Sequence, residues 1–242
     1  MRVAGTVETN ADRRVLVQVV ALAEHARPRE RWVYRSVERG AEAVARRYLG
    51  SQYRHRILLR DTDATPRRVL AALETSTAAP GVEAVDLLVQ PHGTSRRLML
   101  ADGPIDTDDL AARAQARLAP AQRRRLRVVL STACFGVTHN DAWLRCGFAA
   151  AAGARGVYAD GLTSVPAMLR AWAAGATVQE AVDAANGAGS RRLQDAVAAH
   201  YYRHTGRQPD ADAVDSERLV DGARGMTIGT DPASWRPRSL PA

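Results

Sequence analysis

Lysine is absent from this sequence of 242 residues, so all 34 basic residues are arginine. With 26 acidic residues they give a formal net charge of +8. The arginines are scattered, with one triple at 123–125, and aromatic residues do not alternate with them as in grooves that stack single-stranded nucleic acid. The missing lysine and the abundant alanine indicate a compositional bias of the source genome rather than selection for phosphate contacts. This distribution does not favour nucleic-acid binding as the main function, and such binding stays open as a third interpretation.

Long hydrophobic runs and a cysteine framework are absent as well. No apolar run approaches the ~18 residues of a membrane span, and the first residues lack the apolar core of a signal peptide. Cys134 and Cys146 are too few for a disulfide framework in a chain of this length. We therefore expect a soluble protein without membrane association, with reduced thiols and a cytoplasmic location.

Short apolar runs alternate with amphipathic stretches along the chain, which is typical of an α/β domain with a largely parallel sheet. The length fits one domain, which we place at 13–236, after a polar N-terminal extension (1–12) and before a proline-broken tail (237–242). A small hairpin turned at Asp102-Gly103 is expected after the third strand. Predicted strands cover 15–22, 53–59, 85–91, 128–133, 156–159 and 226–229, and predicted helices cover 36–49, 65–78, 107–118, 142–152, 165–174, 177–186 and 190–204.

Two of the predicted strands end in a reactive side chain. The third stops at His92-Gly93, and the fourth stops at Cys134. Parallel strands present their carboxyl ends at one edge of a sheet, where ligands bind, so we expect the imidazole and the thiol to meet there if the strands are neighbours. Such a pair is the minimum for cysteine nucleophilic catalysis. Gly93 lets the main chain approach a substrate closely and present its N–H to a developing oxyanion.

Each of these residues also has a plainer interpretation. A single cysteine at a strand end is more often a small buried hydrophobe, and a histidine there is often only a polar group satisfied by the backbone. Other thiol chemistries fit poorly, because there is no Cys-x-x-Cys pair and Asn140 stands where the phosphatase signature needs arginine. His200 and His204 have a spacing that can bind metal, but no third ligand is apparent and a solvated helix face explains them better.

A strand ending in His-Gly followed by one ending in Ala-Cys resembles the pattern of the caspase-like cysteine peptidases, and the sequence looks most similar to the bacterial CHAT and gingipain-type members. Residues 149–157 resemble the helix, Gly-Ala turn and fifth strand of such members, and 228–232 resemble their hydrophobic-Gly-Asp-Pro ending with Thr230 inserted. Asp160-Gly161 stands where many members have a tryptophan. The fold that the resemblance implies is a three-layer sandwich, with a mostly parallel six-stranded sheet covered by helices on both faces.

The resemblance implies a cysteine endopeptidase, a hydrolase that acts on a protein substrate without metal or organic cofactor. Cys134 would attack the peptide carbonyl, His92 would protonate the leaving amine, and the backbone N–H groups of Gly93 and Cys134 would form the oxyanion hole. A catalytically inactive scaffold or binding module is the alternative, because this fold also has inactive members.

Substrate preference is less defined by the sequence. The resemblance places Thr132, two residues before the nucleophile, in the specificity pocket. Asp160 and, more weakly, Asp102 are candidate acceptors for a basic side chain, although both precede glycine and turn chemistry explains them better. The arginines of residues 27–31 are candidate acceptors for an acidic side chain instead.

The short connection after Cys134 carries an inference about regulation. Caspases are activated by cleavage of a long segment between the fourth and fifth strands, and little more than a turn and one helix is expected here. We therefore expect a single uncut chain that is switched on by a protein partner, a ligand or assembly. A homodimer formed through the last strand is an expectation by analogy.

Overall fold

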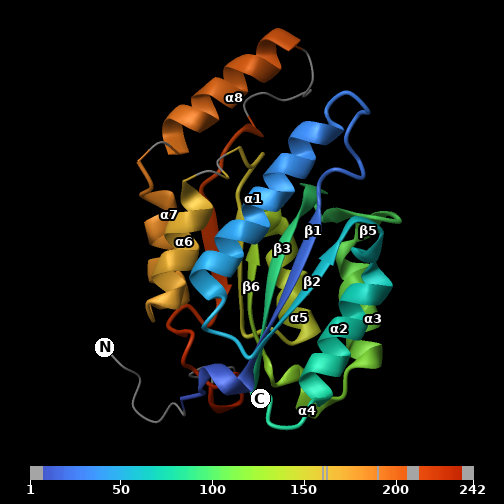
Figure 1. Ribbon diagram of the computed structural model, residues 1–242, viewed down its shortest axis with the longest axis vertical. Helices are drawn as coiled ribbons and strands as arrows, with labels where there is room; N and C mark the ends of the chain where they lie inside the picture. Colours follow the sequence, from blue (N-terminus) through green and yellow to red (C-terminus); the bar gives the residue numbers. More distant parts are fainter. Residues whose placement is uncertain (1–7, 160, 162, 190, 206–212, 236–242) are drawn as a thin grey trace.

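The computed structural model describes residues 8–159, 161, 163–189, 191–205 and 213–235. Its centre is a twisted sheet whose main path has the order β2-β1-β3-β6-β7-β8 (Figure 1). The first five of these strands run parallel, and β8 runs antiparallel to β7. The bounds are Arg14–Ala21 (β1), His55–Arg60 (β2), Ala84–Thr94 (β3), Leu126–Ser131 (β6), Ala150–Ala154 (β7) and Arg218–Gly222 (β8).

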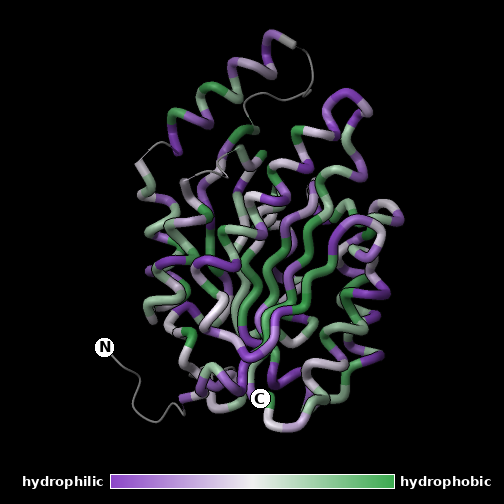
Figure 2. Tube along the Cα trace, viewed as in Figure 1, coloured by the Kyte–Doolittle hydropathy of each residue, from purple (hydrophilic) through white to green (hydrophobic). Residues whose placement is uncertain are grey.

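Helices cover both faces of the sheet, which gives the three-layer α/β sandwich that the resemblance implied (Figure 1). One apolar layer lies between the strands and α2, α3 and α5, and the other lies between the strands and α1, α6 and α7. Figure 2 shows the hydrophobic residues concentrated along the central strands. The helices are Arg31–Leu49 (α1), Pro66–Ala78 (α2), Thr107–Arg117 (α3), Pro120–Arg123 (α4), Asn140–Cys146 (α5), Ser164–Ala173 (α6), Val178–Asn186 (α7) and Arg191–Thr205 (α8).

Most of the predicted elements are confirmed, with shifted ends. The predicted hairpin forms from β4 (Arg97–Leu100) and β5 (Gly103–Asp106), and it extends β3 past the predicted end because β4 pairs with its last residues. Helix α1 begins at Arg31 rather than at residue 36. None of the described helices is both long and apolar enough to cross a membrane.

The helix predicted over 142–152 is wrong in its second half. Helix α5 stops at Cys146, where Gly147 takes a φ of +115°. The alanines that follow form β7, a strand buried between β6 and β8. Alanine has a high intrinsic helix propensity, but burial on both faces of a sheet overrides that preference here.

The fifth strand predicted at 156–159 is also wrong, because β7 already occupies the position next to β6 in the sheet. Val157 makes only an isolated bridge to Val214. The small residues of β7 are needed because Gly153 passes so close to the backbone of Gly136 that a side chain on either would collide with the other.

The last strand predicted at 226–229 is also wrong. Thr227 makes an isolated bridge with Thr177, while the sixth strand of the main path is β8, in a segment that reads as a polar loop. Arg218 explains the error, because its charged side chain is only 1% exposed and lies over the Tyr158 ring at 4.4 Å.

The predicted domain boundaries stay predictions. The predicted tail, 237–242, lies outside the described residues. Part of the predicted N-terminal extension packs on the domain, since Glu8 bridges Thr230 and the backbone N–H of Thr9 donates to the carbonyl of Gly229 at 2.7 Å.

A buried ion pair joins β3 to β6. Arg127 donates to both carboxylate oxygens of Asp86, from Nε at 2.8 Å and from Nη2 at 2.6 Å, and both side chains are almost fully buried. The Tyr53 hydroxyl also donates to Asp86 and accepts from the indole N–H of Trp172 at 3.1 Å. Arg127 further donates to the carbonyl of Ile228. The network thus ties two central strands to α6 and to the C-terminal segment.

We predict that Asp86→Ala destabilises the fold by roughly 3–5 kcal/mol, because it leaves the Arg127 charge buried without its partner. The free energy of unfolding in urea measures the effect. Asp63→Ala is the matched control, since Asp63 pairs with Arg68 on the surface with both side chains 59% exposed, and we expect little change. An Asp86→Ala loss no larger than that of the control would contradict the prediction.

Candidate functional site

The ends of β3 and β6 meet at the carboxyl edge of the sheet, as the sequence predicted. The two strands are parallel neighbours, and Gly93 of β3 packs against the residues that follow β6. A methyl group on Gly93 would lie 2.7 Å from the Cys134 carbonyl oxygen and 3.0 Å from Cβ of Ala133. The structure therefore brings the His92-Gly93 end of one strand against Cys134 at the end of the other.

The chain turns sharply after Cys134. Phe135 has the left-handed φ of 54°, and its backbone N–H donates to the carbonyl of Gly156 at 2.7 Å. A short 3₁₀ helix, Gly136–His139, follows at once. The turn holds Cys134 between the end of β3 and the segment after β7.

The thiol of Cys134 is surrounded by backbone donors. Burial raises the pKa of the Cys134 thiol, and the N–H groups of Tyr158, of Cys134 itself and of Gly93 act in the opposite direction because they stabilise the thiolate. The Tyr158 N–H lies 3.4 Å from Sγ. The thiol is thus mostly protonated at neutral pH, in a place where several N–H groups can accept negative charge.

His92 is held on two sides. Burial lowers the pKa of its imidazole and the nearby His25 lowers it further, while a hydrogen bond to the carbonyl of Leu22 raises it. The ring of Tyr34 packs edge to face with the His92 ring at a centroid distance of 5.0 Å. The neutral imidazole that results uses one nitrogen to donate to Leu22, which leaves the lone pair of the other available to take a proton.

The site contains residues that the sequence did not reveal. His139 is fully buried, and its Nε2 donates to the carbonyl of Thr94 at 2.8 Å, one residue after Gly93. Tyr158 follows β7, and Leu22 follows β1. These contacts join elements far apart in the sequence, so no local pattern could have indicated them.

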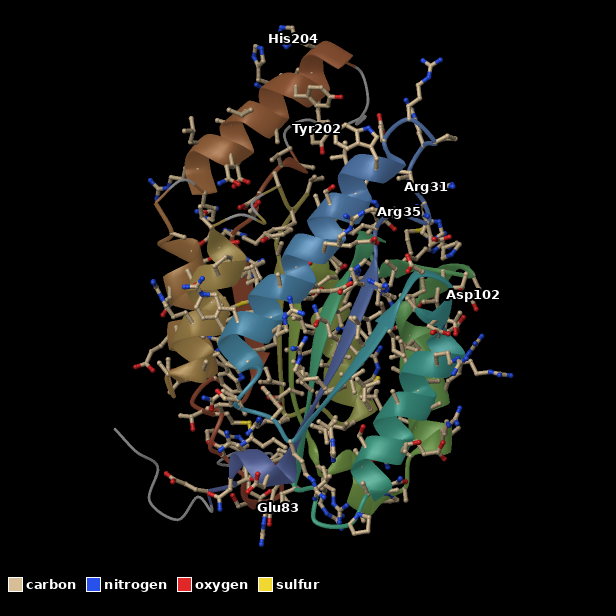
Figure 3. The ribbon with its side chains drawn as sticks, viewed as in Figure 1. Arg31, Arg35, Glu83, Asp102, Tyr202 and His204 are labelled. Carbon is tan, nitrogen blue, oxygen red and sulfur yellow. The ribbon has the colours of Figure 1, made fainter. Side chains whose placement is uncertain are left out.

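Helix α8 lies over the same end of the molecule. Tyr202 points from α8 toward the start of α1 (Figure 3). Burial raises the pKa of the Tyr202 hydroxyl, and the charges of Cys134 and then Tyr34 raise it further, which puts Tyr202 within electrostatic reach of the site.

The structure places the three predicted substrate-binding residues in different surroundings or leaves them undescribed. Thr132 lies beside the site, where its backbone N–H donates to the carbonyl of Val89 at 2.8 Å. Asp160 lies outside the described residues. Asp102 is exposed at the turn of the β4–β5 hairpin, where Gly103 has a φ of +118° (Figure 3). Turn geometry accounts for Asp102, and its role in substrate binding stays a prediction that no contact supports.

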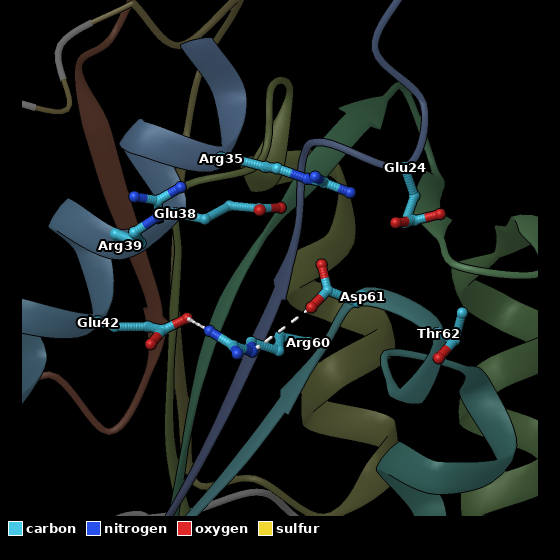
Figure 4. Close-up of a pocket in the computed structure, with 8 residues that line it drawn as sticks. All are labelled: Glu24, Arg35, Glu38, Arg39, Glu42, Arg60, Asp61 and Thr62. Atoms are coloured by element: carbon cyan, nitrogen blue, oxygen red, sulfur yellow. Dashed lines mark hydrogen bonds and ion pairs between the residues drawn. The ribbon is translucent and has the colours of Figure 1, made fainter. Parts of the chain in front are cut away.

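A charged pocket of about 420 Å³ lies near the carboxyl ends of β1 and β2 (Figure 4). Its charges partly compensate each other, since Arg60 pairs with Glu42 at 3.2 Å and with Asp61 at 3.4 Å. The arginines predicted to accept an acidic side chain lie nearby, in the loop after β1 and at the first residue of α1, and Arg27 and Arg29 line a second pocket there. No cluster suited to a metal ion is found among the residues that the structure describes. The first pocket is lined by Glu24, Arg35, Glu38, Arg39, Glu42, Arg60, Asp61 and Thr62.

No family model matches this sequence, and no curated protein matches it. Solved structures do resemble the chain. The Drosophila initiator caspase Dronc superposes with a TM-score of 0.51 at 9% identity, over 96% of this chain and 91% of that one. Caspase-1 from Spodoptera frugiperda gives 0.52 at 10% identity, over 93% and 92%. A secreted C11 cysteine protease from Bacteroides thetaiotaomicron gives 0.47 at 12% identity, over 87% and 66%. The chain therefore has the caspase-like α/β fold.

We predict opposite effects of adding one methyl group at two glycines. Gly93→Ala should lower the free energy of unfolding, because the nearest atom is the backbone oxygen of Cys134 at 2.7 Å and cannot move aside cheaply. Gly40→Ala, in α1 with open space around it, should raise that free energy by about 0.5–1 kcal/mol through helix propensity. Urea denaturation of both variants measures the difference. Equal stability of the two would mean that β3 does not approach Cys134 as described.

Proposed function

We propose that this protein is a cysteine endopeptidase that hydrolyses a peptide bond in a protein substrate. The observation that carries the proposal is the set of backbone N–H groups around the Cys134 sulfur, with His92 fixed at the end of the adjacent strand. The caspase-like fold supports it, because its neighbours include caspases. The closer likeness to CHAT and gingipain-type members rests on sequence motifs alone.

In the proposed reaction, the thiol proton of Cys134 moves to the free nitrogen of His92 as the sulfur attacks. The sulfur attacks the peptide carbonyl carbon, and the N–H groups of Gly93 and Cys134 receive the oxyanion, each worth roughly 2.7–4 kcal/mol in other enzymes. The C–N bond then breaks, and His92 gives its proton to the leaving amine. Water attacks the resulting thioester, His92 takes up a water proton, and the proton returns to the sulfur as the acid leaves.

The pKa directions define the resting state of this pair. A raised thiol pKa and a lowered imidazole pKa both favour the neutral pair over the thiolate–imidazolium pair at neutral pH. Proton transfer then accompanies attack, when charge develops on the substrate oxygen close to the backbone donors. A protein partner or an assembly step that activates the chain, and a cytoplasmic setting that keeps both cysteines reduced, belong to the same proposal.

A non-catalytic caspase-like module that binds a protein partner is the second candidate. The partial burial of Cys134 favours it, because desolvation raises the pKa of the thiol and a raised pKa lowers the reactivity of a cysteine. The two candidates differ in whether Cys134 forms a covalent bond with a substrate.

We predict that Cys134→Ala abolishes peptide cleavage and that His92→Ala lowers kcat roughly 10²–10⁴-fold, the usual contribution of a general acid–base group. Circular dichroism should show an unchanged fold in both variants. Cys146→Ala should retain activity, because Cys146 is buried at the end of α5 and takes no part in the site. Cleavage that persists in Cys134→Ala would refute the proposal.

We also predict selective labelling of the two thiols. A peptide-derived electrophile should modify Cys134 and spare Cys146, whose thiol pKa burial raises to about 12. Alkylation of Cys134 by iodoacetamide should accelerate as the pH rises past the ordinary thiol pKa of about 8.5, since burial shifts this thiol upward. Peptide mass spectrometry measures both rates. Failure of the electrophile to label Cys134, with iodoacetamide still reacting, would favour the binding module.

A further inference from the structure

Helix α1 turns two side chains, Tyr34 and Glu38, toward His92 and the end of β1. Their spacing of four residues places them on one face of the helix. Tyr34 packs on the His92 ring at 5.0 Å. Glu38 is only 5% exposed, and buried carboxylates are rare unless they are paired or hydrogen-bonded.

The Glu38 carboxylate binds the backbone just after β1. Its Oε1 accepts from the N–H of Leu22 at 2.8 Å and from the N–H of Ala23 at 2.9 Å. Hydrogen bonds to an ionised acceptor are roughly twice as strong as neutral ones. These two bonds therefore fix the position of the peptide plane between Leu22 and Ala23.

That same peptide plane acts on His92. The N–H of Ala23 and the carbonyl of Leu22 belong to one peptide unit, in which the N–H donates to Glu38 and the oxygen lies where it raises the pKa of the His92 imidazole. A negative charge at the N–H end polarises the amide and makes its oxygen a better acceptor, as in other chains of hydrogen bonds. A carboxylate thus acts on the imidazole through one intervening peptide.

Different charged groups surround Glu38 and His92. Glu38 shares its pocket with Arg35, Arg39 and Arg60, and with the carboxylates of Glu24, Glu42 and Asp61 (Figure 4). Arg60 is engaged by Glu42 and Asp61.

His92 has Tyr34 from α1 and His25 from the loop after β1 as its titratable neighbours. Tyr202 of α8 lies within electrostatic reach of Cys134 and Tyr34.

We propose that Glu38 is a positioning residue for His92, acting through the Leu22–Ala23 peptide, with the Tyr34 ring as the second support. The role rests on the proposed peptidase function, in which His92 must present a fixed tautomer to the thiol and then carry a positive charge. The Glu38 charge stabilises that imidazolium, and the Tyr34 ring restricts its rotation.

Glu38→Gln tests the charge, because it keeps the length and an acceptor oxygen of the side chain. It should lower kcat about tenfold, the scale of a charged hydrogen bond reduced to a neutral one, with KM unchanged. NMR titration of ¹⁵N-histidine-labelled protein should show the pKa of His92 falling, since the bond that favours the charged imidazole is weakened. Tyr34→Ala, which removes the ring, should lower kcat several-fold.

Glu42→Gln is the matched control, one turn further along α1, with its carboxylate bound to Arg60. It should leave kcat and the His92 titration unchanged. A lower His92 pKa in Glu38→Gln alone supports the role of Glu38 even if the wild-type protein cleaves nothing, in which case only the peptidase proposal fails. An unshifted His92 titration in Glu38→Gln, or a raised KM with kcat unchanged, would overturn the role.

Discussion

The buried ion pair between Asp86 and Arg127 is the constraint on which the site depends. It joins the strand that ends at His92 to the strand that ends at Cys134. The pairing of these strands shifts in register between Val85 and Leu87, so the ladder alone leaves their alignment weakly defined at that point. A slip of one residue would turn every side chain of a strand to the opposite face. A bidentate pair with nearly complete burial is costly to break, and it therefore fixes which strand ends face each other.

The site itself is built mainly from backbone. Four strand ends contribute to it at one edge of the sheet: the carbonyl of Leu22 after β1, the N–H of Gly93 in β3, the N–H of Cys134 after β6 and the N–H of Tyr158 after β7. Parallel strands bring these groups to the same edge of the sheet. Glycine at 93 lacks the side chain that would hold the end of β3 away from the end of β6. Side chains such as Glu38 and His139 act on this backbone rather than on the site directly.

The sequence predicted the strands that carry the site because they are continuous runs of valine and leucine with turn residues at their ends. It failed for β7, where alanine suits a helix in isolation, and for β8, where Arg218 and Asp221 look like a solvated loop. The segments 149–157 and 228–232, which supported the family resemblance, adopt other structures than expected. His92, Gly93 and Cys134 stood out by their positions at strand ends. Leu22, Tyr34 and Glu38 could not, because only tertiary packing brings them to His92.

The central claim is that Cys134 forms a thioester with a peptide substrate, and mass spectrometry of an acid-quenched reaction with a peptide library tests it most directly. The account predicts cleaved peptides that share a preferred residue before the broken bond, together with the matching acyl mass on the peptide that contains Cys134. An intact library with Cys134 unmodified would contradict it.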